Sequence, residues 1–242
     1  MDIYKGLLFI PDGGPEKYLY EGVDYYRYMD KLYIPKPPSE LNQADVSALS
    51  EMRLKLGDEV IDLNYSLDVV KHLVSLLKLN SNSKVIDFGC GGGMFCNYLK
   101  ESNSSNLTSE ILGLDISSFA VKEFMNNHHD LDLKTISALY FDGMTKLEYP
   151  DNYFDGVISS FVMHFNIFEN QMAEIFRILK PNGRIVYNDY VYHKYKGQTK
   201  KLILMLKNIG FEIEESVKSF KHPETKDIKN HKIITAIKPT SF

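Results

Sequence analysis

The sequence lacks long apolar runs and has few cysteines. No segment of the 242 residues approaches the roughly 18 consecutive apolar residues that a membrane-spanning helix needs. The first residues, MDIYKGLLFIPDGG, lack the basic start and long apolar stretch of a secretory leader, so we expect a cytoplasmic protein with no membrane partner. The two cysteines, Cys90 and Cys96, lie close together in the sequence, which predicts reduced thiols, no disulfide framework and no metal site.

The chain also lacks a strong excess of charge of one sign. Its formal net charge is −4, and only residues 191–242 are basic, with eleven Lys and Arg against five Asp and Glu. Proteins that bind nucleic acid usually carry a dense basic patch. We therefore expect no DNA partner, although an RNA or protein partner remains open and the oligomeric state is not predicted.

The composition is that of one main folded unit, with 44% apolar and 25% charged residues. From residue 66 onward, short β-rich apolar runs alternate with segments of helical spacing, which is typical of an α/β fold. The last two strands are separated only by a polar segment, which favours an antiparallel hairpin. The expected fold is a doubly wound, mostly parallel sheet of seven strands that ends in this hairpin; the strands are expected at 84–89, 111–115, 133–141, 154–160, 184–189, 211–219 and 232–238.

Helices are expected between these strands, and two of them have clear end signals. Ser117 is a natural N-cap for a helix over 118–129, because its hydroxyl can accept from the first free amides. Pro181, Asn182 and Gly183 should close a helix over 171–180, with the glycine in a positive-φ conformation. Further helices are expected at 66–79, 92–100 and 200–210.

Residues 1–65 have a different character and form a separate predicted unit, an N-terminal extension or lid before the domain of residues 66–242. This part holds five of the nine prolines and six tyrosines between Tyr18 and Tyr33. Tyrosine suits surfaces that must be both apolar and hydrogen-bonding. Tyr25, Tyr26 and Tyr28 are therefore candidate substrate-binding residues if this segment folds over the site.

The most informative segment is VIDFGCGGG, residues 85–93, where an apolar strand runs into a glycine-rich turn that opens a helix. Such turns let backbone amides approach a ligand. A dinucleotide-binding turn would need a sixth-position glycine, but Met94 or, in the later register, Cys96 stands there. A phosphate-binding loop would need Gly-Lys-Ser/Thr, and no lysine follows before Lys100. Both of these nucleotide patterns are thus excluded.

Three acids follow or end successive predicted strands: Asp87, Asp115 and Asp142. Each has a purely structural alternative, since Asp142 could form a turn with Gly143 and Asp115 could cap the next helix. The carboxyl ends of parallel strands meet at one edge, where open α/β sheets bind ligands. Together the three acids favour a ligand site at this edge.

With these features the sequence resembles the class I S-adenosylmethionine-dependent methyltransferases, whose first motif reads acidic-x-Gly-x-Gly-x-Gly. The resemblance continues in order through ILGLDIS, YFDGMTKLEYPDNYFDGVISS and RILKPNGRIV. It covers about residues 83–190, is looser to about 238 and does not include the first 65. Within the family the chain looks most like the small-molecule enzymes of the ubiquinone-biosynthesis type. The resemblance implies a Rossmann-like methyltransferase fold with S-adenosylmethionine as the cofactor.

The resemblance also implies roles for individual residues. Asp87 and the amides of the glycine turn would hold the methionine part, and Asp115 the ribose hydroxyls. Ile116 would lie against the adenine, and Asp142 would accept from its amino group, with Gly143 or Met144 offering an amide. Ser160 would end the fourth strand beneath the cofactor. The implied cofactor-binding set is Asp87, Gly89, Cys90, Gly91, Gly93, Asp115, Ile116, Asp142, Gly143 and Ser160.

The implied reaction is in-line displacement of the methyl group onto N, O or C of a small molecule. His164, in the segment that leaves the fourth strand, is the candidate base, and Asp189 is a second candidate catalytic residue. Tyr190 could contact the acceptor. By contrast, His128 and His129 are expected to be solvated at a helix end, and His231 has no evident partner.

Two alternatives remain at this point. An RNA or protein methyltransferase would share the cofactor half, although the segment Ser159–Val162 lacks the Asn/Asp-Pro-Pro-aromatic motif of enzymes that methylate base amino groups. A catalytically inactive, cofactor-binding or partner subunit could keep the same fold, because fold alone does not establish function.

Overall fold

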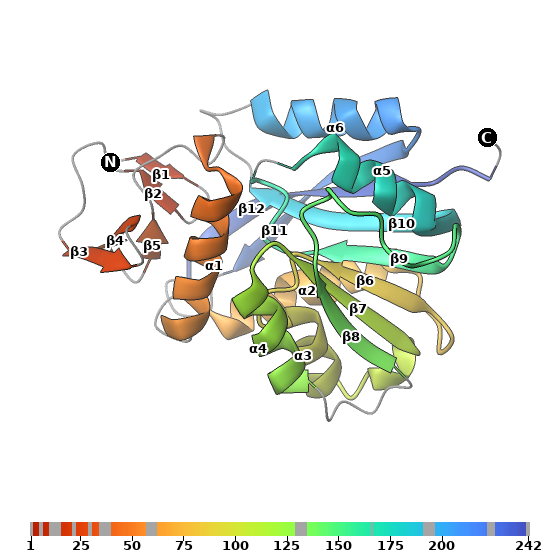
Figure 1. Ribbon diagram of the computed structural model, residues 1–242, viewed down its shortest axis with the longest axis horizontal. Coiled ribbons are helices and arrows are strands. Elements are labelled where there is room, and N and C mark those ends of the chain that lie inside the picture. The colour runs from red at the N-terminus through yellow and green to blue at the C-terminus, as the bar shows by residue number, and fades with distance from the viewer. Residues whose placement is uncertain are drawn as a thin grey trace.

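The computed structural model describes residues 2–4, 7–9, 16–20, 23–28, 31–33, 40–56, 62–128, 135–165, 167–190, 197–221 and 226–240. Figure 1 shows a central twisted sheet with helices on both faces, and a smaller N-terminal part beside it. Within the described residues, no helix has the length and apolar character needed to cross a membrane.

The central sheet has seven strands in the order β11-β12-β10-β9-β6-β7-β8. The five strands from β10 to β8 run parallel, while β12 is antiparallel to both β10 and β11. This arrangement confirms the predicted fold class and the C-terminal hairpin. The strands are β6 (Lys84–Phe88), β7 (Glu110–Asp115), β8 (Thr135–Tyr140), β9 (Phe154–Ser159), β10 (Leu179–Tyr190), β11 (Glu212–Lys221) and β12 (Ile228–Ile237).

The order of the strands reverses at β6. The chain proceeds from β6 outward to β7 and β8, and then returns to the other side of β6 as β9. In open α/β sheets, a ligand crevice forms outside the carboxyl ends of the strands at such a reversal. The position of the site is thus set by topology before any side chain is considered.

Two apolar cores lie on opposite faces of the sheet. One is covered by α2 (Leu63–Leu77), α3 (Met94–Glu101) and α4 (Ser118–His128), and the other by α5 (Glu169–Ile178) and α6 (Gly197–Ile209). A 3₁₀ turn, η3 (Ser105–Leu107), lies in the polar segment before β7. As predicted, Ser117 caps α4, because its Oγ accepts from the amide of Ala120 at 3.2 Å.

Most element boundaries differ from the sequence prediction by a few residues, and for two of them the structure shows the local cause. Helix α2 begins at Leu63 because the Asp62 carboxylate accepts from the amide of Tyr65 at 2.9 Å. Helix α5 ends at Ile178, and the positive φ in the following turn belongs to Asn182, at 63°, so its assignment to Gly183 was wrong. Gly183 is required for space instead, since a Cβ there would lie 2.7 Å from the Lys180 carbonyl.

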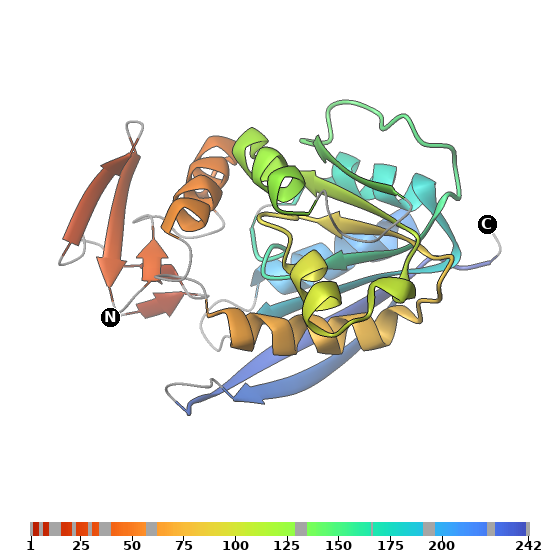
Figure 2. The same ribbon diagram turned by 90° about the horizontal axis from the view of Figure 1, so that it is seen from below.

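The described residues of the N-terminal part form two small sheets and a helix that the sequence did not predict. A hairpin of β1 (Asp2–Tyr4) and β2 (Leu7–Phe9) is followed by a meander of β3 (Glu16–Tyr20), β4 (Val23–Tyr28) and β5 (Lys31–Tyr33), and then by α1 (Gln43–Leu56). Figures 1 and 2 both place α1 between these small sheets and the central sheet, next to α4. Helix α1 is therefore the N-terminal element closest to the crevice.

Candidate functional site

The three predicted acids lie at one edge of the central sheet. β6, β7 and β8 are neighbours in parallel register, with Asp87 near the end of β6 and Asp115 at the end of β7. Asp142 follows β8 after one residue. The structure therefore brings the acids to the edge that the sequence predicted; their roles in cofactor binding stay predictions.

Asp87 is the most unusual of these groups. Its side chain is only 3% exposed, and burial, reinforced by the negative charge of Asp115, raises its pKa to about 7. Among the described residues, its Oδ2 atom is buried and has no hydrogen-bond partner. A buried acceptor left unpaired costs about 1–3 kcal/mol. The site is therefore suited to a ligand that brings a cationic donor to this oxygen.

The glycine turn is tied to the end of β7 by its own amides. The amides of Gly89 and Cys90 donate to the Leu114 carbonyl at 2.7 and 3.1 Å, and that of Gly91 donates to Asp115 Oδ2 at 2.9 Å. The amide of Gly93 donates to the Cys90 carbonyl at 2.8 Å. These four donors are already used within the protein. An anionic ligand group would instead have to use the first turn of α3, where Gly93 supplies no side-chain cap.

The backbone conformation of the turn and its close neighbours explain why glycine is needed there. Gly89, Gly91 and Gly93 have φ values of 73°, 51° and 85°, which L side chains rarely adopt. A Cβ on Gly89 would overlap Val162, and a Cβ on Gly93 would overlap His128. Gly91 alone of the three has open space beside it, with no atom within 4 Å of a built Cβ. A ligand can approach the turn from that side.

His128 is a correction to the sequence analysis. It was expected to be solvated, but its side chain is buried, with Nε2 at 2.8 Å from the Gly92 carbonyl oxygen and its ring 5.4 Å from that of Phe124. His128 therefore connects the end of α4 to the glycine turn. His129, which shared that prediction, lies outside the described residues.

Cys90 contributes to packing at the turn. A Cβ on Gly113 would lie 3.0 Å from the Cys90 sulfur, so the thiol packs against the face of the sheet at β7. Burial raises the pKa of this thiol well above its usual value, and burial raises that of Cys96 too. Both side chains therefore remain protonated packing groups, and only the backbone of Cys90 shapes the turn.

Asp115 is buried and its two oxygens are held separately. Oδ2 accepts from the Gly91 amide and Oδ1 from the Ser117 amide, both at 2.9 Å. Burial raises its pKa, while these backbone bonds and one from Ile116 act to lower it. Ser117 is the cap of α4, so the alternative in which Asp115 is the N-cap is wrong. The carboxylate is a fixed group at the rim, and Ile116 is half-buried next to it.

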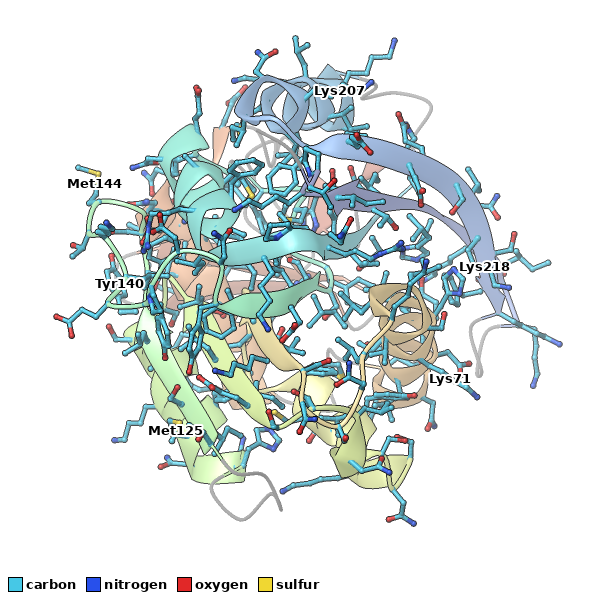
Figure 3. The ribbon with its side chains drawn as sticks, turned by 90° about the vertical axis from the view of Figure 1, so that its right-hand side faces the viewer. Lys71, Met125, Tyr140, Met144, Lys207 and Lys218 are labelled. Carbon is cyan, nitrogen blue, oxygen red and sulfur yellow. The ribbon has the colours of Figure 1, made fainter. Side chains whose placement is uncertain are left out.

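Asp142 lies in a turn of its own at the outer end of the edge. Its Oδ1 accepts from the Met144 amide at 2.8 Å, so that amide is already used, and Gly143 has a φ of 84°. Figure 3 shows Tyr140 and Met144 at this same outer edge. A hollow of about 610 Å³ lies beside the turn; it is lined by Glu40, Leu41, Asn42, Gln43, Ala44, Asp142, Met144, Phe168 and Asn170.

Helix α1 runs along this edge from the hollow to the glycine turn. At its start, Gln43 Nε2 approaches the Asp142 carbonyl at 3.5 Å. Near its end, Leu54 Cδ2 lies 2.9 Å from the position of a Cβ on Gly92, and the Lys55 ammonium lies 5.1 Å from the ring of Phe119 in α4. The helix is thus an outer wall of the crevice.

The residues predicted for catalysis lie at the other half of the edge, where His164 follows β9 and Asp189 is near the end of β10. His164 is 2% exposed and its ring lies 4.1 Å from that of Phe165. Asp189 is buried and accepts from the Thr199 hydroxyl at 2.5 Å. Ser160 is half-buried, while the hydroxyl of Ser159 donates to the Phe88 carbonyl at 2.8 Å. Their catalytic roles remain predictions.

The predicted substrate tyrosines are only partly described. Tyr25, Tyr26 and Tyr28 lie in β4, and Tyr190 ends β10 in backbone register with His231. Their side chains lie outside the described part of the structure. No group of three or more His, Cys, Asp or Glu side chains within the described ranges could hold a metal ion.

Sequence reasoning missed a buried polar cluster around His231. This histidine was given no partner, yet it is fully buried, its Nε2 bonds to the Tyr65 hydroxyl, and its Nδ1 lies 3.0 Å from Asn188 Nδ2. Asn188 in turn accepts from the Phe161 amide at 2.9 Å. No local pattern could have found it, because Tyr65 and His231 are 166 positions apart. His193 and His222 lie outside the described residues.

Comparison with solved structures supports the fold. The [4+2]-cyclase SpnF superposes with a TM-score of 0.64 at 18% identity, covering 84% of this chain and 98% of that one. At this identity the likeness concerns the fold alone, and a cyclase on this fold is a reminder that the reaction must come from the site.

Similarity to curated proteins of known activity gives more specific information than similarity of fold. The chain is 30% identical over 156 residues to phosphoethanolamine N-methyltransferase 3 of Arabidopsis thaliana, which is 62% of this chain but only 29% of that protein. It is 28% identical over 215 residues to phosphoethanolamine N-methyltransferase of Plasmodium falciparum (isolate 3D7), covering 84% of this chain and 77% of that relative. The chain thus spans less than a third of the Arabidopsis relative. A family model described as a methyltransferase domain matches residues 79–232, well over half of the chain, and the protein therefore belongs to this methyltransferase family.

Proposed function

We propose that this protein transfers the methyl group of S-adenosylmethionine to a small-molecule acceptor. The observation that carries the proposal is the buried, unpaired Oδ2 of Asp87 beside the glycine turn. Asp87 Oδ2 would accept from the ammonium group of the cofactor, which would provide the charge and the donors that this oxygen lacks. The family match supports the same cofactor.

The other residues of the edge fit the remaining parts of the cofactor. Asp115 would accept from the ribose hydroxyls, and the hollow beside Asp142 would take the adenine. The first turn of α3 would face the carboxylate, since a helix N-terminus favours an anion. When bound, this cofactor supplies a methyl group on a positively charged sulfur, which is already activated for displacement.

The protein then contributes alignment and exclusion of water. Well-aligned reactants gain about 7–11 kcal/mol from proximity in favourable cases. Helix α1 covers the crevice on one side, and Val162 covers the glycine turn on the other. His164, after β9, is the residue we assign to accept a proton from an acceptor that must lose one. The imidazole is buried within the post-β9 loop, residues 160–165. This loop would therefore have to move for a bound acceptor to contact the imidazole.

The small-molecule acceptor is supported by what the relatives are named for. They include phosphoethanolamine N-methyltransferases and a 24-methylenesterol C-methyltransferase of Arabidopsis thaliana. The weak overall charge of −4 also disfavours a nucleic-acid acceptor. The acceptor itself is to be found by experiment.

Calorimetric titration with S-adenosylhomocysteine tests the cofactor part. We expect Asp115→Ala to weaken binding by about 1–3 kcal/mol, because it leaves polar groups unpaired. Asp155→Asn is a matched control, since this carboxylate bonds to the Lys84 amide at 2.9 Å and the Lys180 ammonium at 2.7 Å, near the opposite ends of the strands. An equal affinity of wild type and Asp115→Ala would contradict the ribose assignment.

Incubation with a labelled methyl donor tests the acceptor part. The panel should contain phosphoethanolamine, a sterol, RNA and a protein extract. Transfer to a small molecule that falls strongly in His164→Gln supports the proposal, and transfer only to RNA or protein overturns it. Binding of the cofactor without transfer to any class would instead favour an inactive, cofactor-binding subunit.

A further inference from the structure

A chain of hydrogen bonds joins four elements at the carboxyl edge of the sheet. It runs from Tyr65 in the first turn of α2, to His231 in β12, to Asn188 in β10, and on to the backbone of Phe161 in the post-β9 loop. The three side chains are buried, with Asn188 and His231 fully so. Buried polar groups that satisfy one another in this way fix one arrangement of the elements they join.

The direction of each bond follows from chemistry. Asn188 Oδ1 accepts from the Phe161 amide at 2.9 Å, so the Asn188 amide nitrogen is the atom that donates to His231 Nδ1 at 3.0 Å. Nδ1 is therefore the unprotonated nitrogen of the imidazole. The proton lies on Nε2, which donates to the hydroxyl oxygen of Tyr65.

The surroundings of His231 favour this neutral form. The rings of Tyr65, Phe161 and Phe220 lie within 5.4–5.9 Å of it. Burial, with a smaller contribution from the Lys229 ammonium and against the attraction of Asp189, lowers its pKa to about 4. A charged imidazole would present N–H groups to both partners and break the bond from Asn188.

The far end of the chain holds a strained piece of backbone. Phe161 has a φ of 60°, a conformation that costs about 1–3 kcal/mol for a residue other than glycine. The next residue, Val162, is the one that closes over Gly89, and His164 follows in the same loop. The hydrogen bond from the Phe161 amide to Asn188 thus fixes the backbone immediately before Val162 and His164, and so it constrains the positions of both side chains.

We propose that Tyr65, His231 and Asn188 are positioning residues that hold the post-β9 loop against the glycine turn. Through Val162 they set the shape of the methyl-donor side, and through the loop they set the place of His164 on the acceptor side. The reaction part of this inference rests on the proposed function, whereas the loop-positioning part does not.

The first test needs no ligand. Asn188→Leu keeps the size of the side chain and removes both bonds, so hydrogen exchange of the Phe161 and Val162 amides is expected to speed up about tenfold or more, while the amides of β6 stay protected. Tyr153→Phe is the control. It removes a partly buried hydroxyl that donates to Glu110 at 3.0 Å, near the opposite ends of the strands, and it should leave hydrogen exchange in the loop unchanged. Wild-type exchange rates in Asn188→Leu would overturn the proposal.

The second test measures affinity for S-adenosylhomocysteine. Asn188→Leu and His231→Phe should weaken binding about fivefold or more by releasing Val162, and His231→Gln, which keeps a donor and an acceptor, should recover part of the loss. Tyr65→Phe removes a single hydroxyl and remains informative if the larger changes prevent folding; it should show the same two effects at smaller size. Unchanged exchange and unchanged affinity in both Tyr65→Phe and His231→Phe would refute the positioning role.

The two proposals fail in different ways. If wild type gives no heat with S-adenosylhomocysteine, the proposed function fails. Hydrogen exchange of the Phe161 and Val162 amides still decides whether Tyr65, His231 and Asn188 position the post-β9 loop. Once an acceptor is known, the variants should lower kcat more than they raise KM, because a displaced His164 affects the chemical step more than acceptor binding. The reverse pattern would assign these residues to acceptor binding and overturn their role in placing His164.

Discussion

Asp87 determines much of the behaviour of the site at the residue scale. Without a cation beside it, a carboxylate with a pKa of about 7 is largely protonated below neutral pH. Above neutral pH the folded protein therefore buries a negative charge, and this lowers its stability. Functional sites often hold such unfavourable groups, because the ligand supplies the missing interaction.

The first prediction concerns stability. The pKa of Asp87 is higher in the folded protein than its ordinary value of 3.8, so its contribution is full below pH 4 and is lost as pH rises through 7. Asp87→Asn removes this loss. It should raise the free energy of unfolding relative to wild type at pH 8 by up to about 4 kcal/mol, and the difference should shrink toward pH 4. Urea unfolding at pH 4, 6 and 8 measures it; a pH-independent difference would contradict the buried-charge origin.

The second prediction concerns protons released on binding. A cationic ligand lowers the pKa of Asp87, so S-adenosylmethionine binding near pH 6 should release close to one proton, and binding at pH 9 almost none. Calorimetry in two buffers of different ionisation enthalpy gives the number directly. Asp87→Asn is the control and should bind weakly with no release. Release of the same size at both pH values would show that another group is responsible.

The third prediction separates conformation from space within the glycine turn. Gly91 and Gly93 both have positive φ, but only at Gly93 would a Cβ overlap another side chain, that of His128. Gly91→Ala should cost about 1–2 kcal/mol from its backbone alone. Gly93→Ala adds overpacking and should cost about 2–5 kcal/mol. Denaturant unfolding compares the two; equal losses would mean that His128 can move aside freely.

The sequence predicted some site residues better than others for a physical reason. Asp87, Asp115 and the glycines follow from a local pattern of strand, turn and helix. The burial of His128 and His231 depends on partners that folding brings from elsewhere, Gly92 for one and Tyr65 for the other. Their neighbours in the sequence are polar, which suggested solvent exposure.

At the scale of elements, α1 is the unexpected part of the crevice. Its residues QADVSALSEMRLKL lack a clean apolar stripe, although Asn42 and Asp45 exchange cap bonds of 2.8 and 3.1 Å at its start. Those two residues are the signal that could have indicated a helix. Its buried side chains, such as Leu49 at 1% exposure, show that the helix is held by packing.

The fourth prediction tests α1 as a wall of the site. Leu54→Ala removes the side chain over Gly92 and should weaken S-adenosylhomocysteine binding several-fold while changing stability by less than about 2 kcal/mol, since Leu54 is only half-buried. Glu51→Ala on the same helix breaks an ion pair with Lys55 at 2.8 Å. Ion pairs in contact with solvent contribute little to stability. Glu51→Ala should bind as wild type does; a loss equal to that of Leu54→Ala would point to general fraying of α1.

At the scale of the whole molecule, the seven-stranded, mostly parallel sheet and its hairpin were predictable and the N-terminal part was not. Strands alternating with helices leave few arrangements, because parallel connections follow one hand. Residues 1–65 contain short strands of three to six residues, which give almost no periodic signal. The boundary drawn at residue 65 falls inside the first turn of α2.

The fifth prediction concerns this N-terminal part. Within the part of the chain that the structure describes, both large core clusters draw their buried residues from Tyr65 onward, so a chain that begins at residue 40 should unfold within a few degrees of the full protein and should bind the cofactor equally well. A chain that begins at residue 62 also loses α1 and should bind more weakly. Thermal unfolding and calorimetry compare the three. Weak cofactor binding by the chain that begins at residue 40 would indicate that the N-terminal strands β1–β5 contribute to the site.

Both native thiols are buried and the chain has no tryptophan. A cysteine introduced in place of Met144, which is 80% exposed at the rim of the hollow, would thus be the one thiol open to a maleimide dye. The fluorescence of that dye would report occupancy of the hollow against a dark background. The protein is in this sense already prepared for optical screening of its ligands.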